Sequence, residues 1–262
     1  MTTFERRHSL LELLRKQPGL RVPELATILG VSEGTVRNDL NALDQQGKLT
    51  RVHGGAVLNE PSTFQSNSFM LRFQKNTAAK LAIAREAAAL VNEGDSILLD
   101  ASSTCYYFAR ALAGCNKLRV ITNGFEAARE LSQNSSNTVI LIGGVVSYDS
   151  SSVTGLLSEQ IISELRIQKA FFSCSGFSLE RGMTEVHLGE AQIKQKAIKS
   201  SHQVIALIDS SKFGKDDLTS FARPEEISCL ITDAGLSLEW ISKLQEAGID
   251  YTLCEEEVVA IK

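Results

Sequence analysis

From residue 95 onward the chain alternates short apolar runs with segments of helical periodicity, and this alternation constrains the fold more than any other feature. The apolar runs, many of them rich in β-branched residues, are SILLD, LRVITN, TVILIGG, KAFFSCSGF, QVIALID, CLITD and YTLCE. The helical segments between them are 104–113, 124–133, 154–165, 189–200 and 237–247. Buried strands that alternate with helices are typical of a mostly parallel sheet with helices on both faces. The sequence therefore predicts an α/β domain over residues 75–262, preceded by a polar linker at 59–74.

The first 58 residues follow a different pattern, in which three short helices precede a hairpin. The helices are expected at about 3–16, from near Pro23 to Gly30, and from the N-cap Ser32 to about Gln46. Two helices joined by the tight turn LGVS form a helix-turn-helix, and a hairpin at 49–58 would make it winged. The alternative is a fragment of an ordinary helical bundle, because short helix pairs are common.

The third helix distinguishes these two interpretations through the side chains on its faces. At 100° per residue, Val36, Leu40 and Leu43 fall together and must face the core. The opposite face collects one arginine and three amides without an acid; its members are Gly34, Arg37, Asn38, Asn41 and Gln45. Arginine and amide side chains are those that read base edges in the major groove. The pattern predicts a recognition helix that presents Ser32, Thr35, Arg37 and Asn38 to DNA.

The net charge of the chain also differs between residues 1–58 and the rest. Residues 1–58 carry eight Lys and Arg against six Asp and Glu, a net charge of +2, whereas the other 204 residues carry nineteen against twenty-five, a net charge of −6. This charge distribution permits a nucleic-acid role for the first part only, and a net charge of +2 does not by itself establish one. The five cysteines are scattered, which favours reduced thiols in a cytoplasm over disulfides or a zinc site. No apolar run approaches the ~18 residues of a membrane span, and the first residues do not match a signal peptide.

Polar residues follow several of the predicted strands, at the edge where open α/β sheets bind ligands. These residues are Asp100, Ser102, Ser103, Thr104, Thr122, Asn123, Gly143 and Gly144. Three hydroxyls at a helix N-terminus suit a phosphate, although either serine could equally be an ordinary N-cap. The carboxylate, amide and hydroxyl groups suit a polyol, so a phosphorylated sugar would use both sets.

Three charged residues allow two interpretations each. Glu190 and Lys194, spaced i and i+4 on a helix, either line the pocket or form an exposed ion pair, and the exposed pair is the more common case. Lys212 either reaches a phosphate or lies in a solvated turn.

The stretch Arg51 to Ala56, RVHGGA, contains the His-Gly-Gly that opens the oxyanion loop of many lipases and esterases. That loop belongs to a fold with a Gly-x-Ser-x-Gly nucleophile elbow, and the chain contains no such match. It also contains no Walker loop, GxGxxG or His-x-x-x-His. We therefore expect no catalytic residue, cofactor or metal.

The segment VSEGTVRNDLNALDQQGKLTRVHGGAVL resembles the amino-terminal signature of the DeoR family of bacterial sugar-operon regulators. DASST, TN, IGG, GMTEVHLGEAQIK and DSSKFG resemble blocks of that family's effector domain, in the same order. The resemblance implies a winged-helix DNA-binding domain followed by a domain similar to ribose-5-phosphate isomerases. It also implies a repressor modulated by a phosphorylated sugar, and a homodimer or homotetramer on operator DNA.

Carried over by position, the resemblance adds Arg51 and His53 of the wing to the DNA contacts, and it places Glu190, Lys194 and Lys212 in the effector pocket. ASST at 101–104 and TEVH at 184–187 depart from the family's usual blocks, which bears on the choice of ligand. Two rival functions remain at this point. One is an active sugar-phosphate isomerase with Glu190 or Asp100 as its base, and the other is a nucleoid-type protein without an effector.

Overall fold

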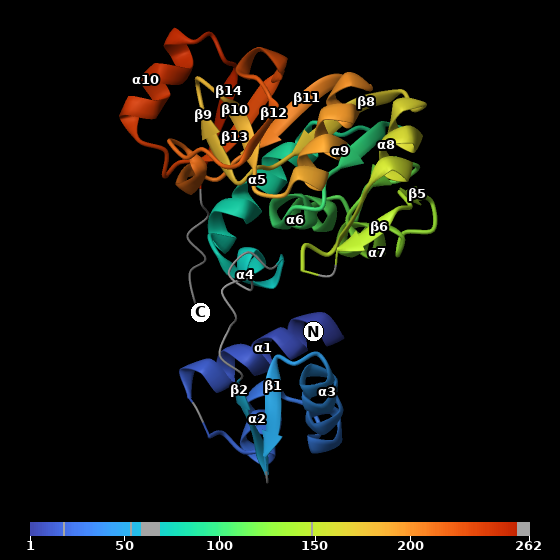
Figure 1. The fold of residues 1–262 in the computed structure, drawn as a ribbon, viewed down its shortest axis with the longest axis vertical. Helices are drawn as coiled ribbons and strands as arrows, with labels where there is room; N and C mark the ends of the chain where they lie inside the picture. The colour runs from blue at the N-terminus through green and yellow to red at the C-terminus, as the bar shows by residue number, and fades with distance from the viewer. Residues whose placement is uncertain (18, 53, 59–68, 148, 256–262) are drawn as a thin grey trace. The chain divides into compact units, whose positions relative to one another are not determined.

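The computed structural model describes residues 1–17, 19–52, 54–58, 69–147 and 149–255. It divides into two compact units, 1–66 and 67–262, which are described separately below (Figure 1). Within the described ranges, no helix is both long enough and apolar enough to cross a membrane.

The first unit contains three helices and a two-stranded hairpin, as the sequence predicts. The elements are α1 (Thr3–Lys16), α2 (Val22–Leu29), α3 (Glu33–Gln45), β1 (Leu49–Val52) and β2 (Gly55–Leu58). Ser32 caps α3 by accepting a hydrogen bond from the Thr35 amide, and Gly30 ends α2 in the left-handed conformation. Leucines from all three helices and from β1 form a common core, so the unit has a buried interior of its own.

The second unit is built on a seven-stranded sheet in the order β14-β13-β11-β8-β3-β4-β5, in which every pair is parallel. The strands are β3 (Ser96–Leu99), β4 (Arg119–Thr122), β5 (Thr138–Leu141), β8 (Ile167–Phe172), β11 (Ser201–Leu207), β13 (Cys229–Asp233) and β14 (Tyr251–Cys254). Ile97, Leu98 and Leu99 are all buried although successive side chains point to opposite faces, so both faces of the sheet are covered at its central strand β3. The predicted α/β class is confirmed.

Helix α5 (Thr77–Ala89) precedes the sheet, and five further helices lie between its strands close to the predicted ranges. They are α6 (Ser103–Ala111), α7 (Phe125–Leu131), α8 (Leu156–Ser163), α9 (Leu188–Lys199) and α10 (Leu238–Glu246). Two short 3₁₀ turns, η2 (Ser210–Lys212) and η3 (Pro224–Glu226), follow β11 and precede β13.

Three features of this unit differ from the sequence expectation. Helix α4 (Phe69–Gln74) occupies the end of the expected linker, because Phe69 and Phe73 are buried against Tyr106 of α6. The run KAFFSCSGF is broken after Phe172, so that β8 ends there and β9 (Gly176–Ser178) joins a second sheet. That antiparallel sheet has the order β12-β10-β9, with β10 (Gly182–Glu185) and β12 (Thr219–Ala222). A hairpin of β6 (Val145–Ser147) and β7 (Ser152–Thr154) follows β5.

The strand order places a topological switch point between β3 and β8. From β3 the chain steps outward through β4 to β5, then returns to β8 on the other side of β3 and steps outward to β14. In open α/β sheets, ligands bind beyond the carboxyl ends of the strands at such a point.

Candidate functional site

Helix α3 presents the face that the sequence predicts. Val36, Leu40 and Leu43 are almost completely buried. Ser32, Arg37, Asn38 and Asn41 are exposed, and Thr35 is half-buried with its hydroxyl 2.8 Å from that of Ser32. These side chains therefore remain accessible to a ligand of the first unit.

The acids of α3 lie differently from the expectation. Asp39 is buried and receives Arg6 Nε at 2.5 Å and Arg7 Nε at 2.8 Å, so α1 neutralises it. Glu33 reaches the outward face, where its carboxylate lies 2.7 Å from Arg37 Nη2. The expectation of an outward face without an acid is thus wrong at Glu33, because an i,i+4 spacing places the two side chains together.

Arg51 of the wing is hydrogen-bonded to the recognition helix. Its Nη1 donates to Asn41 Oδ1 at 3.0 Å and to the carbonyl of Arg37 at 3.3 Å. The hairpin thereby holds two of the predicted DNA contacts in a fixed relation. His53 lies outside the described residues, and its role stays a prediction.

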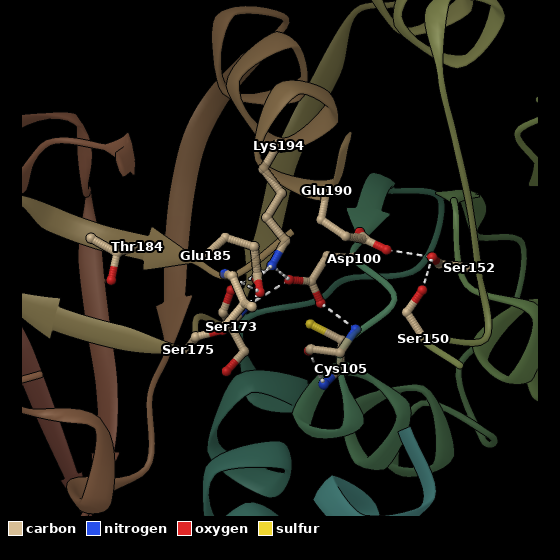
Figure 2. Close-up of polar contacts among 12 residues, drawn as sticks. Asp100, Cys105, Ser150, Ser152, Ser173, Ser175, Thr184, Glu185, Glu190 and Lys194 are labelled. Atoms are coloured by element: carbon tan, nitrogen blue, oxygen red, sulfur yellow. Dashed lines mark hydrogen bonds and ion pairs between the residues drawn. The ribbon is translucent and has the colours of Figure 1, made fainter. Parts of the chain in front are cut away.

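In the second unit, three buried groups meet at the switch point (Figure 2). Asp100 follows β3, Ser173 follows β8, and Lys194 extends from α9. One Asp100 oxygen accepts the Ser102 amide at 2.9 Å, while the other accepts the Ser173 amide at 2.9 Å and lies 3.0 Å from Lys194 Nζ. The carboxylate therefore ties the loops after the two central strands to each other and to α9.

Lys194 also holds a second carboxylate. Its Nζ lies 2.7 Å from Glu185 Oε2 and donates to the carbonyl of Ser173 at 3.0 Å. Burial alone would lower the pKa of Lys194, but Asp100, Glu185 and Glu190 together raise it above its usual range. Burial alone would raise the pKa of Glu185, but Lys194 and the Ser175 hydroxyl hold it at about 2. Both groups are therefore charged at neutral pH.

Glu190 lies on the same helix as Lys194 but forms hydrogen bonds with a different set of residues. Its Oε2 accepts from Asn123 Nδ2 at 3.1 Å, and its Oε1 accepts the Ser152 hydroxyl, which lies 2.7 Å from the hydroxyl of Ser150. Glu190 and Lys194 are 6% and 3% exposed, so the interpretation of these residues as an exposed ion pair is wrong. An i,i+4 spacing gives no information about burial, which here depends on the packing of α9.

A polar hollow lies beside this cluster, at the N-terminus of α6; it encloses ≈ 60 Å³ within a space of ≈ 430 Å³ that is open to solvent. Its lining combines hydroxyl groups, cations and one carboxylate, namely Ser102, Ser103, Thr104, Ser173, Ser211, Asn76, Arg72, Lys75, Lys80, Lys212, Asp209 and Cys174. Ser102 is also the N-cap of α6, since its hydroxyl accepts the Cys105 amide at 3.1 Å. Ser102 is thus an N-cap that also lines the hollow, and its contact with a phosphate stays a prediction.

Two residues of the hollow show how it is built. Asn76 adopts a left-handed conformation and donates through Nδ2 to Asp209 Oδ1 at 2.7 Å, whereas the buried Asp209 Oδ2 has no hydrogen-bond partner among the described residues. Lys80 is buried and donates to the carbonyls of Arg72 and Lys75. Burial lowers the pKa of Lys80 to about 8, against the opposing effect of Asp209.

Three other predicted residues, Thr122, Gly143 and Gly144, form hydrogen bonds or close contacts within the loops that follow β4 and β5. Thr122 Oγ1 accepts the Gly124 amide at 3.0 Å. The carbonyl of Gly143 accepts the Ser158 hydroxyl at 2.8 Å. A Cβ at Gly144 would collide with Ser158 Oγ and the carbonyl of Thr154, so this glycine permits the hairpin to approach α8. None of the three lines the hollow, and their proposed contact with an effector stays a prediction.

Sequence reasoning missed Arg72, Lys75 and Lys80 of the hollow, and it missed Glu185 as a partner of Lys194. Lys80 carried a usable signal, because it falls on the apolar face of an alanine-rich helix together with Ala84 and Ala87. Arg72 and Lys75 carried none, since they fell in or next to the expected linker. Among the described residues, no group of three or more His, Cys, Asp or Glu could hold a metal ion.

Comparison with known proteins gives the same two units. A family model for the DeoR-like helix-turn-helix domain matches residues 6–62, and one for the DeoR C-terminal sensor domain matches residues 75–234. The transcriptional regulator GolR of Listeria innocua is 38% identical over 255 residues, which cover 97% of this chain and 100% of the relative. The lactose phosphotransferase system repressor of Streptococcus mutans is 36% identical over 237 residues, with coverage of 89% and 93%.

A winged helix-turn-helix followed by a sensor domain defines a DNA-binding transcriptional regulator. The chain belongs to the DeoR family. Its relatives are named as regulators and repressors, which supports this function over the isomerase alternative. Among solved structures, ribose 5-phosphate isomerase A of Methanocaldococcus jannaschii is similar to 53% of this chain and 55% of its own, at 20% identity and a TM-score of 0.39.

Proposed function

We propose that this regulator represses a carbohydrate-metabolism operon and that a phosphorylated sugar bound in the hollow of the second unit modulates its affinity for operator DNA. The observation that carries the proposal is the composition of the hollow. Several cations, hydroxyl groups at a helix N-terminus and one unsatisfied buried carboxylate oxygen converge there. The relative from Streptococcus mutans, named as a repressor of a lactose phosphotransferase system, supports the carbohydrate assignment.

The phosphate would lie against the N-terminus of α6. Backbone N–H groups and the positive end of the helix dipole favour an anion there, and the hydroxyls of Ser103 and Thr104 add donors. Lys80 and Lys212 supply positive charge from α5 and from the turn after β11. Because no covalent chemistry is required, these groups need only bind the anion.

The sugar hydroxyls would meet the carboxylate. The buried Asp209 Oδ2 has no hydrogen-bond partner in the part of the chain that the structure describes, and a buried acceptor left unsatisfied costs about 1–3 kcal/mol. A sugar hydroxyl that donates to this oxygen would recover that energy. The adjoining cluster of Asp100, Glu185 and Lys194 is already saturated, so its role would be to position the loops.

Modulation requires a ligand that distinguishes two states of the protein. Arg72, Lys75 and Asn76 belong to the segment that follows residues 59–68, the connection to the first unit. A ligand that draws these side chains toward its phosphate would alter the start of the second unit. This is a direct route by which occupancy of the hollow could favour one arrangement of the DNA-binding units.

The operator would be read by Arg37, Asn38 and Asn41 in the major groove, with Ser32 and Thr35 at the helix N-terminus and Arg51 in the wing. Two copies of the chain would occupy the two halves of a palindromic site, as a homodimer or a dimer of dimers. Selection from random double-stranded DNA with the purified full chain would yield the site, and footprinting would locate its halves.

The effector is tested by thermal unfolding against a panel of sugar phosphates, the same sugars without phosphate, and inorganic phosphate. We expect a sugar phosphate to raise the unfolding temperature and to change operator affinity at least tenfold. Lys212→Met should weaken the response at least tenfold, whereas Lys215→Met, three residues away and outside the hollow, should leave it unchanged. A panel without any stabilising compound, or an equal loss in both variants, would contradict the proposed site.

A further inference from the structure

Strand β5, the hairpin that begins with β6, and helix α8 lie at one end of the seven-stranded sheet (Figure 1). Large exposed apolar side chains occur on β5, β6, α8 and the first residue of α9. We call them the β5–α8 patch. Its members, each 39–70% exposed, are Ile140, Leu141, Val145, Val146, Leu156, Leu157, Ile161 and Leu188.

Contacts between the elements indicate that the patch is one surface. Ile142, Gly143 and Gly144 join β5 to β6, and Ser158 of α8 donates to the Gly143 carbonyl at 2.8 Å. A Cβ at Gly155, the residue before α8, would lie 3.4 Å from Val145 Cγ2. A Cβ at Gly189 would lie 3.3 Å from Thr154 Cβ, so the start of α9 lies against β7.

The edge of the patch lacks the charged residues and proline that commonly protect an exposed sheet edge. In the described structure β5 is the last strand of its sheet and pairs with β4 alone. Edge strands are usually blunted by charged residues or proline. Residues 138–147, TVILIGGVVS, contain neither. Ile140 and Leu141 are adjacent and both 40% exposed, so β5 is open on both faces as well as along its edge.

The exposed area matches what a stable dimer needs. The eight side chains together expose roughly 700 Å² of apolar surface, above the ~300–600 Å² of the largest patch on a typical monomer and close to the ~800 Å² that each partner contributes to a standard interface. We infer that the β5–α8 patch is the surface through which two copies of this chain associate about a two-fold axis, with their β5 strands facing each other.

A second copy is the occupant that this chemistry favours. In a two-fold interface each patch meets its own copy, so an uncharged apolar surface is complementary to itself. Two antiparallel β5 edges would also satisfy each other's free backbone groups. The choice of a second copy as the partner rests on the proposed function in one respect: two DNA-binding units are needed to occupy two operator halves.

The test compares two leucines in matched positions. Leu156 and Leu238 are the first residues of α8 and α10 and are 70% and 81% exposed, but only Leu156 is in the patch. Glutamate is favourable at the first turn of a helix, so neither substitution should impair folding. In sedimentation velocity of the full chain, we expect Leu156→Glu to raise the dimer dissociation constant at least 100-fold and Leu238→Glu to change it less than threefold.

Val146→Glu, on the hairpin, gives a second measurement on the same surface and should also yield monomers with unchanged circular dichroism. A wild-type chain that is monomeric at micromolar concentration would overturn the inference. It would also be overturned by a dimer that both patch variants leave intact. Loss of dimers with sugar-phosphate stabilisation retained would separate this surface from the effector site, whereas failure of the ligand panel alone would leave the surface standing.

Discussion

The two units of this regulator use ionisable side chains in opposite ways. In the first unit, the recognition helix carries the pair Arg37–Glu33 in the open, with side chains 57% and 44% exposed. In the second unit, Lys194 and its two carboxylates are at most 4% exposed. An exposed pair contributes little to stability and is free to exchange partners, whereas a buried group cannot lose its partner without a large penalty. The difference separates side chains that contact a ligand from side chains that hold a site together.

Removing Lys194 tests most directly whether the buried ion pairs hold the second unit together. Lys194→Met would leave Asp100 and Glu185 as buried carboxylates without their cation, which should cost about 3–5 kcal/mol of unfolding free energy. Trp240, the only tryptophan of the chain, lies in α10, so its fluorescence during urea unfolding reports on the second unit alone. The exposed Lys196→Met on the same helix should cost less than about 0.5 kcal/mol. A loss below 1 kcal/mol in Lys194→Met would show that the carboxylates do not depend on it.

The pH dependence of the same experiment has a definite sign. The pKa of Glu185 is about 2 in the folded chain and 4.5 in its reference state, so the stability that Glu185 provides is complete above pH 4.5 and is lost as the pH falls toward 2. Without Lys194, burial would raise the pKa of Glu185. Lys194→Met should therefore regain stability relative to the wild type as the pH falls from 7 to 4. A constant difference over that range would contradict the assigned pair.

The contrast between the units also explains what the sequence could predict. In the first unit the function lies on one helix, and a period of 3.6 residues was enough to place Arg37, Asn38 and Asn41 outward and Leu40 inward. Periodicity failed only at the acids, because the burial of Asp39 depends on Arg6 and Arg7 some thirty residues away.

The effector site depends on residues brought together from distant loops. The rule that ligands bind at strand ends identified Asp100 and Ser102, since it needs only the end of each strand. It missed Glu185, which reaches the cluster through the antiparallel β10, and Lys80, which reaches the hollow from a helix before the first strand. The residues that follow each strand of the parallel sheet do not indicate that Glu185 or Lys80 lies near the site.

The second prediction concerns the exposed pair. Arg37→Ala should lower affinity for the selected operator by about 1–3 kcal/mol, roughly 5- to 150-fold, if Arg37 contacts a guanine edge. Unfolding free energy should change by less than about 0.5 kcal/mol, because the pair with Glu33 is exposed. Binding titrations on operator and on unrelated DNA would measure both specific and non-specific affinity.

Glu33→Gln is the matched control for this prediction. It releases Arg37 without removing it, so operator affinity should stay equal or rise a few-fold. An unchanged footprint in Arg37→Ala would refute the assignment of α3 as the recognition helix. A drop in Glu33→Gln similar to that in Arg37→Ala would show that the pair itself, rather than the guanidinium, is required.

The smallest expected effect concerns how the wing is seated. Gly55 pairs with Arg21, and the Val22 amide donates to the Gly54 carbonyl at 3.0 Å. A Cβ at Gly55 would lie 3.0 Å from the carbonyl oxygen of Leu20, so the hairpin would have to shift by a few tenths of an ångström. Gly55→Ala should therefore cost about 1 kcal/mol, which would appear as faster hydrogen exchange in residues 20–58 of the full chain.

Substitution of a second glycine in the same unit should raise its stability rather than lower it. A Cβ at Gly34, within α3, would approach only Ser32 Oγ, at 3.8 Å, and alanine is favoured over glycine in a helix by about 0.5–1 kcal/mol. Gly34→Ala should thus slow exchange where Gly55→Ala accelerates it, with Trp240 unfolding unchanged in both. If Gly55→Ala leaves exchange unaltered but weakens operator binding, the glycine would serve approach to DNA rather than packing of the wing against the start of α2.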